Sequence, residues 1–275
     1  MPELPEVETV VRDLTKSGIC GCSIRAAAVN WPRTISGSTP EAFIKSLKGK
    51  TIKFVQRRGK YIIIQLCDEN SIYIHLRMTG KLQIHPEGFQ TGKHDHVVFR
   101  LSDERQLVFN DTRKFGRITM SKELPPNVAA LGPEPLEKEF SKDWLQGALG
   151  RKSRAIKPLL LDQSFIAGLG NIYVDEALWQ ARIHPERNSR TITKEEADGL
   201  HSAIRTVLRR GIRNSGTTLG TGESNFYSVA GHRGRNADQL KVFRRDGEPC
   251  PACGRTIQRL IVGQRGTHIC PQCQK

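Results

Sequence analysis

The chain opens with MPELPEVETV, residues 1–10, and the first part of the fold is organised around this stretch. Apolar residues follow one another here at the spacing of a single helix face: Val7, Val10, Val11 and Leu14. Pro5 suits the first turn of such a helix, because the N–H that proline lacks has no partner there. We therefore expect a docked helix that holds the residues before it rigidly.

The acidic residues Glu3, Glu6 and Glu8 have two interpretations. Carboxylates in a first helical turn complement the positive end of the helix dipole, which alone accounts for all three. If Met1 is removed, however, Pro2 presents a secondary amine, and α-amino groups have a pKa near about 8. Such an amine can attack a sugar or carbonyl carbon to form an iminium, with Glu3 moving protons beside it. Taken alone, the stretch favours the first interpretation.

Charge gives the clearest compositional signal. The 275 residues include 43 Lys and Arg against 28 Asp and Glu, for a net charge of +15. A charge of this size indicates a polyanionic partner, DNA or RNA first and an anionic membrane surface a distant second. The chain shows no signal peptide and no apolar run that would span a bilayer, so we expect a soluble, cytoplasmic protein.

Residues 19–122 are mostly strand-like, with short Ile-, Val-, Phe- and Tyr-rich segments about ten residues apart, typical of a β-sandwich or barrel. We expect strands at 51–55, 61–66, 71–76, 81–85, 96–101, 106–110 and 117–120. A helix is expected at 40–47, capped by Thr39.

The proline-rich run 125–136 indicates a linker, and beyond it the apolar period becomes helical. We expect helices at 142–149, 155–161, 172–180 and 194–213. The polar, glycine-rich residues 214–237 predict a mobile loop.

Four cysteines near the C-terminus form two C-x2-C knuckles separated by sixteen residues: Cys250, Cys253, Cys270 and Cys273. This spacing predicts a closed, structural zinc site; two disulfides are the alternative, which a cytoplasmic chain disfavours. Between the knuckles we expect a hairpin with its tip at 263–266, where Arg265 would probe a nucleic acid unless it is simply a solvated turn charge.

Three further motifs have both a structural and a functional interpretation. In the sequence DQSFIAGLGNIY, residues 162–173, Asn171 begins a helix and either binds phosphate at its N-terminus or merely caps a tight turn. The basic residues 151–154 and Lys157 favour phosphate. Lys60, in a basic turn, is most often a solvated edge charge. Met78 and Phe115 either pack into the core or act as wedges that open a base stack.

Together these motifs resemble the bacterial formamidopyrimidine-DNA glycosylases nearly end to end. The matching segments are MPELPEVET, QRRGKY, HLRMTG, KHDH, DTRKFG, GLGNIY, GTTL and the zinc knuckles ending in ICPQCQK. The resemblance implies an α+β protein: an N-terminal catalytic β-sandwich with flanking helices at 1–124, a linker at 125–136, a helix-two-turn-helix DNA-binding domain at 137–242 with a lesion loop near 217–237, and a β-hairpin zinc finger at 243–275.

The resemblance also implies the activity, a bifunctional DNA glycosylase and AP lyase that excises oxidised purines. Pro2 would be the Schiff-base nucleophile, Glu3 the proton donor and Glu6 a support for the N-terminal loop. Lys60 would be a general acid and phosphate contact in β-elimination, and Arg265 would assist δ-elimination.

The same resemblance assigns DNA contacts and partners. The DNA contacts would be His94, Arg113, Lys152 and Asn171, and the void-filling residues Met78, Arg113 and Phe115. Zinc would be the one cofactor, double-stranded DNA with oxidised bases the partner, and the protein a nucleoid-associated monomer without membrane contact.

One stretch departs from the family pattern. Residues 220–237 are richer in Ser, Asn and Arg than the usual loop over the flipped base, whereas Leu4 favours the formamidopyrimidine branch over the endonuclease VIII branch. Two rival functions are a non-catalytic lesion- or single-strand-binding relative and an RNA-binding zinc-ribbon protein. The first does not need Pro2, Glu3 and Lys60 together, and the second leaves the N-terminal motif unexplained.

Overall fold

The computed structural model of the chain describes residues 1–222 and 225–275. Glu223 and Ser224, inside the expected lesion loop, lie outside the described residues. The chain divides into two compact units, which are described separately: residues 1–129 with 212–237, and residues 130–211 with 238–275.

The first unit begins with helix α1 (Leu4–Lys16). Glu3 is its N-cap and forms a capping box with Glu6: the Glu3 side chain accepts from the Glu6 backbone N–H, and Glu6 Oε2 accepts from the Glu3 backbone N–H at 2.9 Å. The apolar stripe expected from the sequence is buried, with Val7 and Leu14 fully inaccessible. The expected docked helix is confirmed.

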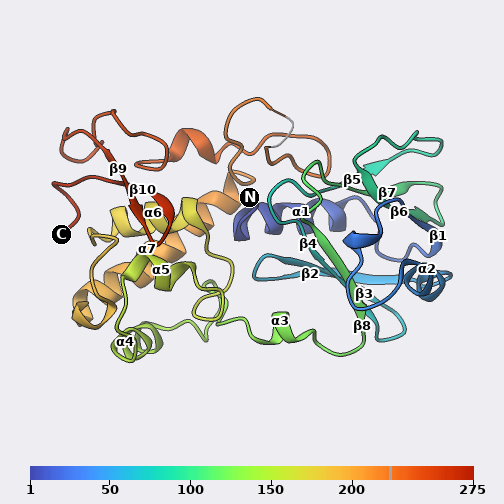
Figure 1. The fold of residues 1–275 in the computed structure, drawn as a ribbon, viewed down its shortest axis with the longest axis horizontal. Helices are drawn as coiled ribbons and strands as arrows, with labels where there is room; N and C mark the ends of the chain where they lie inside the picture. The colour runs from blue at the N-terminus through green and yellow to red at the C-terminus, as the bar shows by residue number, and fades with distance from the viewer. Residues whose placement is uncertain (223–224) are drawn as a thin grey trace. The chain divides into compact units, whose positions relative to one another are not determined.

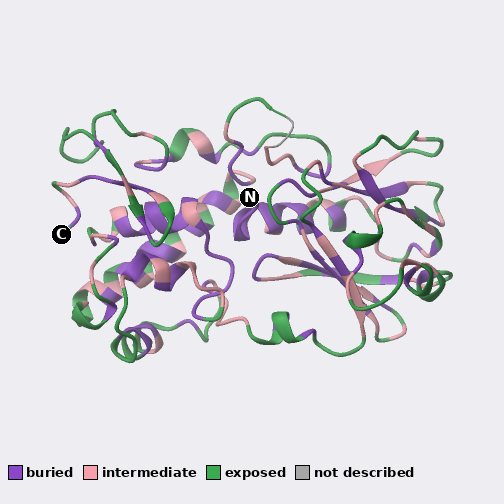
Figure 2. Ribbon diagram, viewed as in Figure 1, coloured by how far each residue is buried: buried purple, intermediate pink, exposed green. Residues whose placement is uncertain are grey.

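Two four-stranded antiparallel sheets form the body of this unit (Figure 1). The first sheet has the order β1-β6-β7-β5 and the second β2-β3-β4-β8. The strands are β1 (Ile24–Val29), β2 (Ile52–Arg58), β3 (Tyr61–Leu66), β4 (Ser71–His75), β5 (Lys81–His85), β6 (Asp95–Leu101), β7 (Gln106–Asn110) and β8 (Arg117–Ser121). Residues of both sheets and of α1 share one apolar core, which lies among the buried residues drawn in purple in Figure 2.

Seven of these strands are the ones expected from the sequence, and β1 was missed. Its sequence, IRAAAV, contains three alanines, which have low strand propensity, and only Ile24 is deeply buried. The strand conformation of β1 is stabilised by its antiparallel pairing with β6 and not by its own sequence. Helix α2 (Pro40–Leu47) is confirmed, and the Thr39 hydroxyl accepts from the Ala42 N–H at 3.2 Å.

Shorter elements complete the first unit. They are the 3-10 helices η1 (Pro32–Thr34) and η3 (Asn236–Gln239), the latter shared with the second unit at its end, and the short helix α3 (Pro126–Ala129) within the expected linker.

The second unit is helical and ends in a hairpin. It contains α4 (Lys142–Gly150), α5 (Ile156–Leu161), α6 (Asn171–Gln180), the 3-10 helix η2 (Ser189–Thr191), α7 (Lys194–Arg213, whose last two residues belong to the first unit), β9 (Gln258–Val262) and β10 (Arg265–Ile269) (Figure 1). The four expected helices are confirmed, and the apolar stripe of α7 is buried. No helix among the described residues has both the length and the apolar character needed to cross a membrane.

The β9–β10 hairpin is tighter than the sequence suggested. Gly263 and Gln264 have φ angles of 54° and 61°, as a two-residue hairpin turn requires, and Arg265 pairs with Val262. A Cβ at position 263 would lie 2.7 Å from the Pro158 side chain, so only glycine fits. Arg265 is therefore the first residue of β10 rather than part of a four-residue tip, and its side chain is exposed.

Candidate active site and nucleic-acid interface

The N-terminal residues are anchored by a buried carboxylate. Glu6 is 1% exposed, and its Oε1 accepts from the Thr217 N–H at 2.7 Å while its Oε2 holds the Glu3 N–H. Pro2 and Glu3 are buried as well. A buried carboxylate is costly unless hydrogen-bond donors surround it. Glu6 therefore holds the backbone beside Pro2 through its two N–H donors, a stronger restraint than the interaction of a surface carboxylate with the helix dipole.

Lys60 lies in the turn between β2 and β3 and is 6% exposed, so the solvated edge charge proposed as an alternative is wrong. Arg57 connects this turn to α1: its Nε donates to Glu8 Oε2 at 3.1 Å, and its guanidinium also donates to the Gly59 carbonyl at 3.1 Å. The turn that carries Lys60 is thus fixed relative to the helix that follows Pro2.

His75, at the end of β4, is affected mainly by its burial and less by nearby positive charges, that of Lys60 among them. Burial, together with the nearby charges of Arg77 and Lys60, lowers the pKa of His75 from 6.5 to about 3. The neutral ring packs edge-on against Tyr61, and its Nδ1 accepts from the Arg77 N–H at 3.0 Å. His75 is therefore an uncharged structural acceptor at neutral pH.

This shift predicts a pH-dependent stability. The folded protein binds the His75 proton less readily than the unfolded chain, so stability falls as the pH drops from about 6.5 toward about 3. We expect His75 to remove about 2 kcal/mol of stability between pH 7 and pH 5. Urea unfolding at the two pH values checks this against His75→Asn, whose amide oxygen can still accept from Arg77. Equal pH dependence of both proteins would contradict it.

Two loops of the first unit expose apolar side chains. Met78, between β4 and β5, is 38% exposed, and Phe115, between β7 and β8, is 47% exposed, so neither packs into the core. The Arg113 guanidinium lies 4.9 Å from the centre of the Phe115 ring. His94 is half-buried, and among the described residues its Nδ1 has no hydrogen-bond partner.

The second unit places Asn171 against the hairpin. Asn171 is the first residue of α6, after the N-cap Gly170, and its Nδ2 donates to the Gly266 carbonyl at 2.8 Å. It is therefore not the cap that one interpretation expected. Lys152 and Arg265, by contrast, are exposed.

Lys157 does not support phosphate binding as the sequence suggested. It is fully buried, and its Nζ donates to Asp175 at 2.6 Å, to Thr267 Oγ1 at 2.8 Å and to the Gly266 carbonyl. The sequence does not indicate this burial, because a lysine that follows the basic residues 151–154 resembles a further surface charge. Lys157 instead fixes β10 to α5 and α6.

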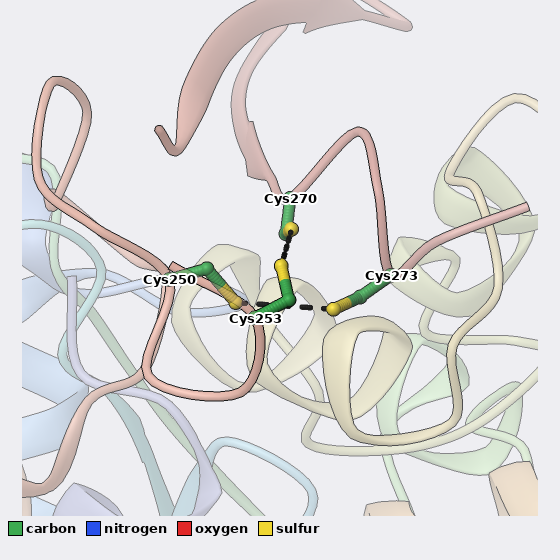
Figure 3. A group of neighbouring side chains, drawn as sticks. All are labelled: Cys250, Cys253, Cys270 and Cys273. Carbon is green, nitrogen blue, oxygen red and sulfur yellow. Dashed lines mark hydrogen bonds between the residues drawn. The ribbon is translucent and has the colours of Figure 1, made fainter. Parts of the chain in front are cut away.

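The four cysteines of the knuckles meet at one point (Figure 3). All four sulfurs lie within 4.8 Å of one another, with Cys253 and Cys270 3.4 Å apart and Cys250 and Cys273 3.9 Å apart. A tetrahedron of sulfurs bound to zinc at ~2.3 Å has edges of ~3.8 Å. The group therefore fits one zinc ion.

The donor chemistry agrees with this geometry. Burial opposes ionisation of Cys250, but N–H groups of Ala252 and Cys253 lower its pKa to about 6. Burial and the neighbouring sulfurs raise the pKa of Cys273 to about 12. Four crowded thiols need a cation before all of them can ionise. The chain holds one structural zinc ion.

Sequence reasoning overlooked two residues of the exposed loops. Thr79 and Asp111 are 6% and 0% exposed, and a hydrogen bond joins their side chains. Thr79 lies in HLRMTG and Asp111 in DTRKFG, two motifs whose charged and apolar residues are the more conspicuous candidates for DNA contacts. The sequence offered one signal: the small polar residue Thr79 directly follows the apolar residue Met78.

Comparison with known proteins covers the whole chain. Residues 1–118 match the formamidopyrimidine-DNA glycosylase N-terminal domain, 131–222 the H2TH domain of the same enzymes, and 247–275 a zinc finger found in FPG and IleRS. The chain is 44% identical over 275 residues to the formamidopyrimidine-DNA glycosylase of Protochlamydia amoebophila, and 44% identical over 278 residues to that of Herpetosiphon aurantiacus, with full coverage of every chain.

Solved structures agree. Wild-type Lactococcus lactis Fpg in complex with DNA containing N7-benzyl-Fapy-dG superposes with a TM-score of 0.91 at 37% identity, over 100% of both chains. The complex of Lactococcus lactis Fpg with DNA containing an abasic site gives a TM-score of 0.91 at 38% identity, over 99% of both chains.

Proposed function

The chain belongs to the formamidopyrimidine-DNA glycosylase family, and from this premise we propose that it excises oxidised purines from double-stranded DNA and then cleaves the strand as an AP lyase. Leu4 and the family match favour oxidised purines such as 8-oxoguanine and formamidopyrimidines as substrates. Because a single chain carries every group that the reaction needs, we propose that it acts as a monomer.

The observation that carries the proposal is the anchored N-terminus. Chain ends usually fray, yet here Glu3 and Glu6 are 3% and 1% exposed and Glu6 holds two backbone N–H groups. Charged groups are seldom buried without a function or a full set of partners. A non-catalytic DNA-binding protein gains nothing from fixing residue 2 in this way.

The chemistry follows from a secondary amine at Pro2, which exists once Met1 is removed. The Pro2 nitrogen attacks C1′ of the damaged nucleotide and loses its proton, and the N-glycosidic bond breaks with its electrons going to the base, which takes up a proton. The C1′–O4′ bond then opens as Glu3 delivers a proton to O4′, and the Pro2 lone pair forms the second bond to C1′. The resulting iminium is cationic at any pH, because its nitrogen carries no proton to lose. It draws electrons from C2′ when the proton there is removed, and the 3′ phosphate leaves with the C3′–O electrons.

A second elimination removes the 5′ phosphate in the same manner, after loss of the C4′ proton. We assign Lys60 as the acid and phosphate contact of the first elimination and Arg265 as the contact that assists the second. The low exposure of Lys60 supports an acid held in place, and the exposure of Arg265 at the start of β10 supports a phosphate contact. Hydrolysis of the final iminium by water then frees the Pro2 amine.

Access to C1′ requires the damaged nucleotide to leave the stack, which costs a few kcal/mol. We propose that Met78, Arg113 and Phe115 fill the space it leaves and face the estranged cytosine. We assign His94, Arg113, Lys152 and Asn171 as contacts to the DNA backbone; such contacts position the protein without selecting a sequence, as damage scanning requires.

Borohydride trapping tests the proposed function. Protein that begins at Pro2, mixed with duplex containing 8-oxoguanine opposite cytosine, should give a covalent adduct on reduction, because borohydride reduces an iminium to a stable amine. A panel with formamidopyrimidine and oxidised pyrimidine duplexes establishes the lesion preference. Mass spectrometry confirms that the protein begins at Pro2. If such protein gives no adduct on any lesion or on abasic DNA, the proposed activity is wrong and the non-catalytic DNA-binding function is favoured.

A further inference from the structure

The two loops with exposed apolar side chains are flanked at both ends by strands that pair with each other. His75 pairs with Arg117 in one sheet, and Lys81 pairs with Asn110 in the other. Residues 76–80 and 111–116 therefore cross between the sheets side by side. We call them the wedge loops. Each contains a non-glycine residue with positive φ, Arg77 at 54° and Lys114 at 59°, a backbone conformation that needs support from its surroundings.

Asp111 supplies that support for its own loop. Its carboxylate is completely buried; Oδ2 accepts from the Gly116 N–H at 2.7 Å and Oδ1 from the Arg113 N–H at 3.2 Å. Gly116 can approach this closely only because it lacks a Cβ, which would lie 2.3 Å from the Phe109 ring. The Asp111 carbonyl is held in turn by His96 Nε2 at 2.7 Å. The Arg113 and Phe115 loop is thus built around one carboxylate.

Thr79 extends this arrangement to the Met78 loop. Its hydroxyl donates to Asp111 Oδ1 and accepts from the Arg113 N–H at 3.2 Å. Thr79 is 6% exposed, and the Gly80 N–H closes its loop on the Leu76 carbonyl at 2.9 Å. One buried hydroxyl therefore bridges the residue after Met78 to the loop that carries Arg113 and Phe115.

We propose that Thr79 and Asp111 are positioning residues that fix Met78 relative to Arg113 and Phe115, so that the three side chains enter the duplex as one rigid wedge. The proposal rests on the void-filling role given to these side chains above. If the two wedge loops moved independently, their side chains would not fill the space left by the flipped nucleotide at the same time, and part of the contact with the DNA would be lost. A fully satisfied buried polar network supplies the rigidity.

The substitution Thr79→Val tests this, since it removes the hydroxyl and keeps the size. On 8-oxoguanine opposite cytosine we expect single-turnover excision to slow about tenfold, in line with loss of a hydrogen bond to a charged group. On 8-oxoguanine opposite a tetrahydrofuran residue, which leaves no base pair to break and no estranged base to face, the rate should stay within about twofold. Thr79→Ser, which keeps the hydroxyl, should restore the rate on the paired lesion.

The matched control is Thr15→Val, whose lost hydroxyl donates within α1 to the Val11 carbonyl at 2.9 Å; both substrates should then react at the wild-type rate. Met78→Ala reports on the wedge itself. If Met78→Ala is slow on the paired lesion and Thr79→Val is not, the positioning role is overturned while the wedge stands. Equal slowing of both substrates by Thr79→Val also overturns it. If Met78→Ala and Phe115→Ala excise the paired lesion normally, the wedge falls and the positioning role with it.

Discussion

A form of this protein that keeps residues in front of Pro2 should lose borohydride trapping by about 10³-fold or more, the scale of loss when a covalent nucleophile is removed. The reason is electronic. Once Met1 or a longer extension is attached, the Pro2 nitrogen is a tertiary amide whose lone pair is delocalised into the carbonyl. It can neither attack C1′ nor form an iminium. Trapping on duplex with 8-oxoguanine, before and after removal of the extension, measures the effect.

Glu3→Gln is the informative partner of that experiment. The amide oxygen of the substituted side chain can still accept from the Glu6 N–H, so the N-cap survives. The variant keeps the amine but loses the proton donor. It should fail to release 8-oxoguanine yet still be trapped on abasic DNA, where the sugar already presents an aldehyde and no base must leave. Affinity for a tetrahydrofuran duplex should change little in either protein. Strong trapping by the extended form would rule out Pro2 as the nucleophile.

The sequence predicted elements wherever local pattern and tertiary burial agree. Helices α1 and α7 have continuous apolar stripes, and strands such as β3 and β7 are short apolar runs between turns. Strand β1 was missed because its alanines have no local preference for a strand. Its conformation depends on pairing with β6, a strand far along the chain.

The residues of the candidate site also differ in how far the sequence predicts them. The four cysteines stand out by type and spacing, so the sequence alone predicts their zinc site, whereas the roles of Pro2 and Lys60 come from the family resemblance. Their burial does not show in the sequence: Lys60 and Lys157 both read as surface charges, yet both are buried for different reasons. The pairing of Thr79 with Asp111 also depends on the fold, because the hydroxyl and the carboxylate belong to residues 32 positions apart, although both residues lie in motifs of the sequence.

Zinc removal should produce the second large effect, loss of DNA binding before any loss of the first unit's structure. The apolar cluster at the knuckles is small: its four buried members are Val242, Cys250, Ile257 and Cys270, with Trp179 and Cys273 packed against them, and Ile261 of the hairpin is 76% exposed. Two of those four are zinc ligands. An isolated two-stranded hairpin is marginal in water, whereas structural zinc contributes about 10–16 kcal/mol of binding free energy to folding.

The contacts of β10 with Asp175 and Lys157 hold one strand directly, whereas β9 and the turn are held through pairing with β10 and the packing of Gly263 against Pro158, and these contacts lose the support of the knuckles once the knuckles open. Arg265 then loses its fixed place, and we expect the affinity for a tetrahydrofuran duplex to fall about 100-fold, or ~2.7 kcal/mol. Chelation and Cys253→Ser should act alike, with zinc content measured by mass spectrometry and binding by fluorescence anisotropy. Cys67→Ser, an exposed cysteine outside the knuckles, is the control and should keep both zinc and affinity. Wild-type affinity in protein shown to be free of zinc would mean that the Lys157 and Asp175 network alone holds the hairpin in its binding conformation.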